Sequence, residues 1–303
     1  MKQYLDALQY VLDNGVEKTD RTGVGTISTF GMQQRYDLSK GFPAVTTKKL
    51  AWKSVVSELL WFIEGTGDER RLAEILHGTR DTSKTTIWSG NATASYWAPK
   101  AAYPGDLGRV YGVQWRHWRG PVEHKAEVFR DDFGNQYHRQ GYVHFDEVDQ
   151  LKSLIEGIKT DPHGRRHILT AWNPGELKSM ALPPCHCFAQ FYVADGRLSC
   201  QMYQRSCDMF LGVPFNIASY SLFTHMIAQV CDLAVGEFVH VLGDAHIYLN
   251  HVDQVKEQLT RTPIEGTQLR LNPNIKDITK FTMADIELVN YLHHGAIKAE
   301  MAV

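Results

Sequence analysis

The chain has 303 residues, of which 43% are hydrophobic and 22% are charged, the balance of an ordinary folded globular protein. This composition excludes an intrinsically disordered chain, and the length is enough to bury a substantial core. A formal net charge of −2 argues against nucleic-acid binding through overall charge, although a local basic pocket is compatible with it.

The cysteines and the N-terminus indicate the compartment. All five cysteines lie between Cys185 and Cys231, and an odd number without a secretory leader pattern does not match a secreted disulfide framework. We therefore expect a reducing, cytoplasmic location. The longest apolar-leaning run, residues 215–235, is interrupted by polar side chains and predicts a buried helix, not a membrane span.

The N-terminal elements follow from hydrophobic spacing. Apolar residues recur at helical spacing from Leu5 to Leu12, and Asn14-Gly15 marks the end of that helix. After a glycine-rich loop, residues 26–30 alternate as a strand does. Residues 55–63 are apolar nearly all round, which predicts a core helix that carries one acid, Glu58.

The middle of the chain, residues 64–150, is the least regular part. Within it the polar stretch 117–145 is predicted to be an insertion over the surface. Helical spacing returns from Val148 to Ile158 and ends before Asp161-Pro162. From residue 168 onward, strand-like and helical segments alternate, and Asp195-Gly196 predicts the turn of a β-hairpin. Since no linker divides the chain, we expect one α+β domain over residues 1–303.

The segment Pro183-Pro184-Cys185-His186-Cys187 contains the most distinctive cysteines. A cysteine is often simply a small buried hydrophobe, and a Cys-X-Cys pair can belong to a metal site. No second pair at zinc spacing accompanies this one, so we predict no metal site. Cys185 fits a nucleophile better, and it then needs a cationic neighbour that favours the thiolate.

The segment Gln204-Arg205-Ser206-Cys207-Asp208 offers such a cation. Arg and Ser together suit an anion such as phosphate, although the segment could also be a solvated strand end. Arg21, Arg165 and Arg166 are ambiguous in the same way, because each alone is more often a surface residue.

Three further motifs each have more than one interpretation. Glu58, inside an apolar helix, is either a general acid or base with a raised pKa or one half of a buried ion pair. His246 and Tyr248 would share one face of a strand and could bind one ligand; His251 extends them toward a metal cluster that no spaced carboxylate or cysteine completes. Asn216 is either a helix cap or an amide that recognises a ligand.

Taken together, these motifs resemble the thymidylate synthase family over essentially the whole chain. The resemblance implies a three-layer α/β (α+β) fold with a large mixed, twisted sheet that pairs with its copy in a homodimer. It implies dUMP as substrate and 5,10-methylenetetrahydrofolate as co-substrate, with no metal. The matching stretches are DRTGVGT (20–26), GFPAVTTKK (41–49), SELLWF around Glu58, Ile87-Trp88, DLGRVYGVQWR (106–116), GRRHILTAWNP (164–174), MALPPCH (180–186), residues 190–220, GDAHIYLNH (243–251) and the terminal IKAEMAV.

The resemblance also implies roles in catalysis. Cys185 matches the nucleophile that adds to C6 of the uracil, which makes C5 able to attack the one-carbon unit. Glu58 matches the residue that organises water and proton transfer, and Asn216 matches the amide that recognises the O4/N3 edge of uracil. The full catalytic set comprises Cys185, Glu58, Tyr111, His186, Arg205, Asp208 and Asn216.

Binding positions carry over in the same way. The phosphate would be bound by Arg21, Arg205 and Ser206 of one subunit, together with Arg165 and Arg166 of the partner subunit. The rest of the nucleotide would contact Gln204, Asp208, Asn216, His246 and Tyr248. The folate would contact Trp88, Asp208, Leu211, Gly212, Phe215 and the closing tail residues Ala302 and Val303.

The chain departs from the family pattern at three positions. Ser89 stands where the family usually has Asp, Arg109 where it usually has Pro, and Gly295 in a stretch that is usually proline-rich. Ser89 and Gly295 leave open a dUMP hydroxymethylase, in which water captures the methylene intermediate in place of hydride. An RNA-binding second role is not indicated by the mild acidity, and a papain-like hydrolase lacks its Gly-Ser-Cys-Trp context.

Overall fold

The computed structural model describes residues 1–20, 22–124 and 126–300. Arg21, Ala302 and Val303, which the resemblance assigns to the site, lie outside the described residues. Within the described part of the chain, no helix combines the length and apolarity that crossing a membrane would require.

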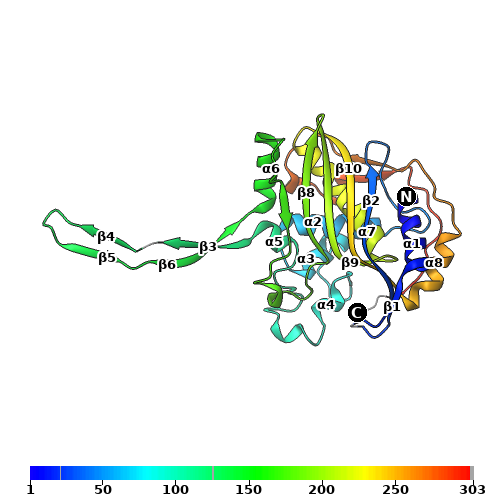
Figure 1. Ribbon diagram of the computed structural model, residues 1–303, viewed down its shortest axis with the longest axis horizontal. Coiled ribbons are helices and arrows are strands. Elements are labelled where there is room, and N and C mark those ends of the chain that lie inside the picture. Colours follow the sequence, from blue (N-terminus) through cyan, green and yellow to red (C-terminus); the bar gives the residue numbers. More distant parts are fainter. Residues whose placement is uncertain (21, 125, 301–303) are drawn as a thin grey trace.

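A six-stranded mixed sheet forms the centre of the molecule (Figure 1). Neighbouring strands are antiparallel except for β9 and β10, which run parallel. In spatial order the strands are β1 (Val16–Lys18), β2 (Thr26–Asp37), β10 (Ala234–Tyr248), β9 (Arg197–Asp208), β8 (His186–Ala194) and β7 (Ile168–Thr170).

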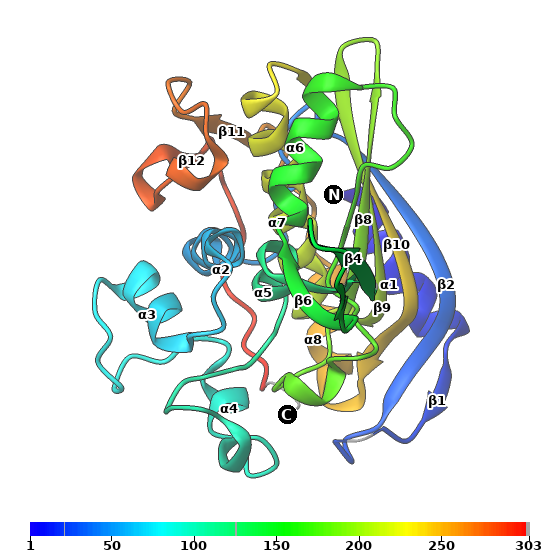
Figure 2. The same ribbon diagram turned by 90° about the vertical axis from the view of Figure 1, so that its left-hand side faces the viewer.

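Two buried helices complete a three-layer arrangement. Helix α7 (Gly212–Val230) packs on β9 and β10, and α2 (Trp52–Glu64) packs on α7, so that sheet, α7 and α2 follow one another (Figure 2). The core between these layers includes Trp61, Phe191 and Phe223, each at most 1% exposed. The expected α+β fold with a large mixed sheet is confirmed.

The remaining elements surround these layers. The helices are α1 (Lys2–Asn14), α3 (Glu69–His77), α4 (Ser89–Ala92), α5 (Gly112–Arg116), α6 (Gln150–Thr160) and α8 (Val252–Leu259). The short 3-10 helices are η1 (Ala98–Lys100), η2 (Leu177–Ser179), η3 (Leu249–His251), η4 (Ile278–Lys280) and η5 (Met283–Asp285). A separate two-stranded sheet pairs β11 (Gln268–Leu271) with β12 (Ile286–Val289).

Several local predictions are confirmed. The first helix ends at Asn14, and all residues from Val55 to Ile63 are buried in α2. The β8–β9 hairpin turns at Asp195 and Gly196, whose φ angles of 49° and 68° are both positive, as a two-residue turn of the favoured hairpin type requires.

Two boundaries were predicted wrongly. The helix expected over 215–235 begins at Gly212 and ends at Val230, because Asp232 adopts a left-handed φ of 55° and the chain enters β10 at Ala234. Val148 belongs to a strand, and helix α6 begins after Asp149, whose side chain accepts a hydrogen bond from the Lys152 amide at 2.9 Å.

The polar stretch around residues 117–145 forms a long two-stranded arm that projects from the body (Figure 1). We define the arm as residues 118–148. Its inner part pairs β3 (Trp118–His124) with β6 (Tyr142–Val148), and its outer part pairs β4 (Glu127–Arg130) with β5 (Gln136–Arg139). Every residue of β4 and β5 is exposed, so the outer part is held by strand pairing without a core.

Candidate active site

Cys185 lies between the Pro183-Pro184 segment and the start of β8, where two hydrogen bonds of its backbone fix it. Its amide donates to the Tyr111 hydroxyl oxygen at 2.7 Å, and its carbonyl accepts from the Arg205 amide at 2.8 Å. Tyr111 itself has a φ of 25°, a strained value that packing around its buried ring maintains. The chain therefore holds this cysteine on a rigid strand end.

Opposing effects act on the pKa of the Cys185 thiol. Burial raises the pKa of the thiol, whereas the charge of Arg205 and hydrogen bonds from Tyr111 and Ser206 lower it, and burial prevails. Arg205 is held in place because its guanidinium donates to the carbonyls of Pro184 and Pro183, both at 2.9 Å. The expected cationic neighbour is thus present, but it does not by itself make Cys185 a thiolate.

Glu58 is buried in α2 and is not part of an ion pair with any described residue. Its Oε1 accepts a hydrogen bond from the Trp88 indole nitrogen at 2.7 Å. Burial raises the pKa of the carboxyl to about 7, and the hydrogen bond from Trp88 acts against that rise. Of the two interpretations that the sequence left open, a group able to exchange a proton near neutral pH is the one that the geometry favours.

Aromatic rings join Glu58 to the cysteine. The Trp88 ring packs edge-on against Tyr111 at 5.7 Å, and Tyr111 lies 4.2 Å from His186 between ring centroids. His186 Nδ1 is hydrogen-bonded to the Tyr220 hydroxyl at 2.8 Å. Burial, with His240 nearby, lowers the pKa of His186 to about 3, so this histidine is neutral.

A second polar chain lies in the sheet beside the cysteine. His240 Nε2 lies 2.8 Å from Gln204 Oε1, and Gln204 Nε2 donates to Asn216 Oδ1 and to the Ser206 carbonyl, both at 3.0 Å. Asn216 is in the second turn of α7 and is therefore not the helix cap. Its Oδ1 is engaged by Gln204, which leaves its amide group as a donor toward a ligand.

Asp208 ends β9 and organises the start of α7. Its Oδ1 accepts from the amides of Phe210 and Leu211 at 3.0 and 3.2 Å. A side-chain carbon at Gly212 would lie 3.5 Å from the Cβ of Asp208 and 3.8 Å from Asn216 Oδ1, so this glycine sits between the two polar side chains. Leu211 and Phe215 on the same turn are half-buried.

The end of β10 contributes the remaining predicted residues. His246 pairs with Asp208 across the sheet, and its ring packs edge-on against Tyr248 at 5.2 Å. Tyr248 packs against His251, whose Nε2 is hydrogen-bonded to the Glu300 carbonyl at 2.7 Å. The chain thus reaches the site immediately before the tail residues that lie outside the described part.

Arg165 and Arg166 stand apart from this cluster. Both are exposed in the loop before β7, and within the described residues neither guanidinium makes a hydrogen bond or ion pair. The exposed face beside them carries Ile168, Phe188 and Tyr192, which strand pairing places on one side of the sheet.

Three residues of this region were not predicted. Lys48 is buried against the Phe210 ring, and burial lowers its pKa to about 7 while the charge of Asp208 raises it. Tyr220 and His240 complete the two hydrogen-bonded chains. The signal for His240 was its position inside the continuous apolar run 238–242, and Lys48 stood inside the matched stretch 41–49.

Each of the three departures from the family pattern makes defined contacts in the structure. The Arg109 guanidinium donates to Glu176 at 2.6 Å and to the carbonyl of His117 at the base of the arm. The Gly295 carbonyl accepts from Arg261 at 2.7 Å, so the stretch without prolines is still anchored. Ser89 is hydrogen-bonded to Glu69 at 2.7 Å.

Comparison with known proteins agrees with this geometry. A family model described as thymidylate synthase matches residues 2–303, nearly the whole chain. Enzymes of this family transfer one-carbon units, act on dUMP and use methylenetetrahydrofolate. Among the described residues, no three side chains that could bind a metal ion gather at one place. The chain belongs to the thymidylate synthase family.

Proposed function

We propose that this chain is a thymidylate synthase, which converts dUMP to dTMP with 5,10-methylenetetrahydrofolate as the donor of both the one-carbon unit and the hydride. The observation that carries the proposal is the joint position of Cys185 and Glu58. A cysteine beside Arg205 and a buried carboxyl with a pKa of about 7 are linked through Tyr111 and Trp88.

In this proposal Cys185 attacks C6 of the uracil as a thiolate. Because burial raises the pKa of this thiol in the free protein, Arg205 and the hydrogen bonds from Tyr111 and Ser206 must stabilise the thiolate during addition. Glu58 then relays protons at the ring, directly or through water, since a carboxyl with a pKa of about 7 can both donate and accept.

The chain of His240, Gln204 and Asn216 supports uracil as the base. With Oδ1 of Asn216 engaged by Gln204, its amide group is left to donate to the O4 carbonyl of uracil, and the second lone pair of Oδ1 can accept from N3–H. Cytosine presents an amino group at position 4, which would face this amide donor with another donor.

The folate supplies the one-carbon unit and the hydride when it is bound. Leu211 and Phe215 provide half-buried apolar surface next to the Asp208 carboxylate, and the Trp88 ring lies on the Glu58 side. This combination of flat apolar contacts and one acid fits a pterin ring. The Glu300 carbonyl is hydrogen-bonded to His251, which brings the described chain up to residue 300 into the same region.

Product identity tests the proposal against the hydroxymethylase. Purified protein is incubated with dUMP and 5,10-methylenetetrahydrofolate, and products are identified by mass while absorbance follows dihydrofolate. We expect dTMP with stoichiometric dihydrofolate. The anchoring of Gly295 by Arg261 favours an ordered C-terminal stretch and hence hydride transfer. Formation of 5-hydroxymethyl-dUMP and tetrahydrofolate, without the absorbance rise, would overturn the synthase assignment.

A further inference from the structure

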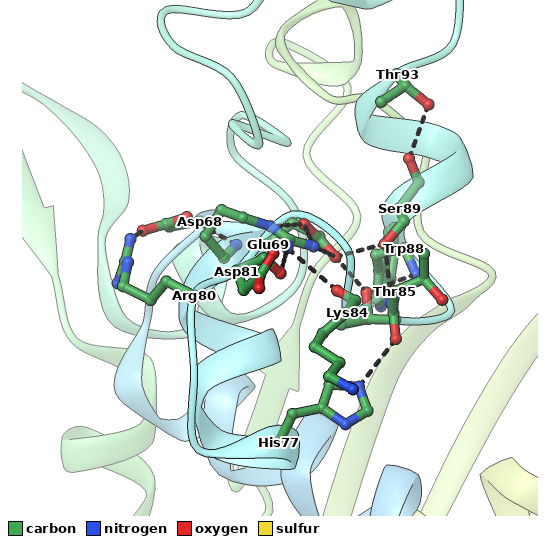
Figure 3. A network of polar contacts seen from close by, with 12 residues as sticks. Asp68, Glu69, His77, Arg80, Asp81, Lys84, Thr85, Trp88, Ser89 and Thr93 are labelled. Carbon is green, nitrogen blue, oxygen red and sulfur yellow. Dashed lines mark hydrogen bonds and ion pairs between the residues drawn. The ribbon is translucent and has the colours of Figure 1, made fainter.

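A buried carboxylate outside the predicted site holds together the loop that carries Trp88. Glu69, in the first turn of α3, is 2% exposed. Its oxygens accept hydrogen bonds from Arg70 Nε, Arg70 Nη2 and the Thr86 hydroxyl, each at 2.6 Å, and from the Ser89 hydroxyl at 2.7 Å. Figure 3 shows Glu69 and Ser89 facing each other with Trp88 beside them.

These hydrogen bonds orient the segment from residue 86 to 89. An ionised carboxylate only accepts hydrogen bonds, so both hydroxyls must direct their protons at Glu69 and keep their lone pairs for other donors. The Thr86 oxygen accepts from the Trp88 amide at 3.1 Å, and the Ser89 oxygen accepts from the Thr86 amide at 2.8 Å. Trp88 in turn donates to Glu58 at 2.7 Å. Glu69 is therefore connected to Glu58 through the hydrogen bonds of Thr86 and Ser89 and through Trp88, which is bonded by its amide to Thr86 and by its indole to Glu58.

Besides these bonds, His77 at the end of α3 contacts the loop, with its Nε2 3.0 Å from the Thr85 carbonyl oxygen. Residues 81–85 and Ile87 are exposed, Thr86 is half-buried, and the regular structure that follows is only the four-residue α4. Arg70, which is paired with Glu69, also donates to the carbonyls of Asp81 and Lys84 at 2.8 and 3.1 Å. The Glu69–Arg70 pair thus binds both ends of the exposed loop to α3.

We propose that Glu69 is a positioning residue for the active site, which holds Thr86 and Ser89 so that the Trp88 indole remains hydrogen-bonded to Glu58. This proposal rests on the proposed function, in which Glu58 exchanges protons at the pyrimidine ring. Ser89, one of the three departures from the family pattern, belongs to this arrangement, because an aspartate there would meet the Glu69 carboxylate.

The consequence at Glu58 has a defined sign. Trp88 donates to the ionised carboxylate and lowers its pKa, so a loosened indole lets the pKa of Glu58 rise above about 7. The ionisable groups that face Glu58 are Tyr111 and Tyr220, whose pKa values burial raises well above 10, and beyond Tyr111 lies His186, neutral with a pKa of about 3. A titration near neutral pH in this pocket thus reports on Glu58.

The test follows the Glu58 carboxyl directly in the free protein. Glutamate labelled with carbon-13 at the carboxyl is titrated by NMR, and Glu58→Gln identifies the resonance. We expect Glu69→Gln to raise the pKa of Glu58 by about half a unit or more, and to shift the corresponding limb of the kcat–pH profile equally. Trp88→Phe should produce a shift of the same sign, and the double variant no more than Trp88→Phe alone.

Matched variants keep the test decisive. Glu74→Gln is the control, because Glu74 lies on the same helix but pairs with Arg71 and Arg80 at the surface. If Glu69→Gln does not fold, Ser89→Ala removes one of the four bonds and should give a smaller shift of the same sign. The proposal is overturned if the pKa of Glu58 stays the same in both Glu69→Gln and Ser89→Ala. It is also overturned if the pKa of Glu58 stays the same in Trp88→Phe. Because the titration needs no substrate, its result is independent of the product assay, and failure of this proposal can be distinguished from failure of the proposed function.

Discussion

The pocket around Cys185 and the arm are built in opposite ways. In the pocket, polar groups from α2, β8, β9, α7 and β10 meet only because distant segments pack together, and Glu58, His186 and His240 are all buried. In the outer arm, β4 and β5 pair with each other and every residue is exposed. Burial shifts the pKa values in the pocket, whereas the outer part of the arm has no buried group on which it could act.

This contrast shows where single substitutions will have large effects. Replacing a side chain that is buried, hydrogen-bonded and in contact with substrate should change the reaction rate, the stability or the substrate selectivity. Replacing a side chain on an exposed two-stranded ribbon should change none of these three properties, unless a partner covers that side chain. The following variants test the contrast, beginning with the largest expected effect.

Cys185→Ser should lower kcat by several orders of magnitude, because covalent addition to the pyrimidine requires the thiolate. Cys187→Ser is the matched control: Cys187 is buried two residues away, and its Sγ lies 3.6 Å from the Cys185 carbonyl. We expect this variant to fold and to retain substantial activity. The measurement is the steady-state rate of each variant at saturating dUMP. If Cys187→Ser were inactive and Cys185→Ser active, the nucleophile would be Cys187.

Arg165 and Arg166 are exposed, yet we predict that they are essential for activity. They are therefore an exception to the expectation that exposed side chains have small effects. We propose that a second copy covers the face with Ile168, Phe188 and Tyr192 and receives this arginine pair at its phosphate site. Cys185→Ser and the double variant Arg165→Ala/Arg166→Ala should each be inactive. Mixed after subunit exchange, they should recover roughly a quarter of wild-type activity, since half of the dimers carry one intact site. Demonstrated exchange without recovery would count against shared sites.

Glu58→Gln should change how stability depends on pH. The folded-state pKa of about 7 lies above the ordinary 4.5, so the contribution of Glu58 is complete below pH 4.5 and is lost as the pH rises to about 7. Relative to the glutamine variant, the wild type should lose up to about 3 kcal/mol of unfolding free energy across this window. Urea unfolding at pH 4.5 and pH 8, at one protein concentration, measures this difference; equal losses in both proteins would refute a raised pKa.

Asn216→Asp should shift base preference from uracil toward cytosine, because an ionised carboxylate only accepts hydrogen bonds and so suits the 4-amino group of cytosine instead of the O4 carbonyl of uracil. A mismatched buried hydrogen-bond pair costs about 1–3 kcal/mol, or roughly 10- to 100-fold in relative kcat/KM or affinity. Binding of dUMP and dCMP to both proteins by calorimetry is the measurement. Equal affinity of the wild type for the two nucleotides would contradict the role of the amide.

Removing the outer arm should have the smallest effect. Replacing residues 126–140 with Asn-Gly leaves β3 and β6 paired and should change kcat and KM less than about two-fold, because β4 and β5 bury no core. Arg109→Ala at the base is the contrasting variant: it breaks partly buried contacts to Glu176 and His117 and should cost about 1–3 kcal/mol of stability. A large loss of activity on removing the outer arm would assign it a role in catalysis or assembly.

Local rules determined much of this protein from its sequence. Residues 55–63 of helix α2 are apolar nearly all round, and Asp195-Gly196 forms a hairpin turn because those two residues tolerate positive φ. The motifs around Cys185 identified the family, and the match over residues 2–303 agrees with them. Each of these inferences depends on neighbours in the chain.

Tertiary structure decided the features that need distant partners. Helix α7 stops at Val230 because the chain must join β10 beside β9, a pairing that no local pattern encodes. The pKa of Cys185 is raised because burial outweighs Arg205, and Glu69 reaches Trp88 through side chains 17 and 20 residues further along. Desolvation and hydrogen bonding depend on what surrounds a group in space, and the sequence states only what precedes and follows it.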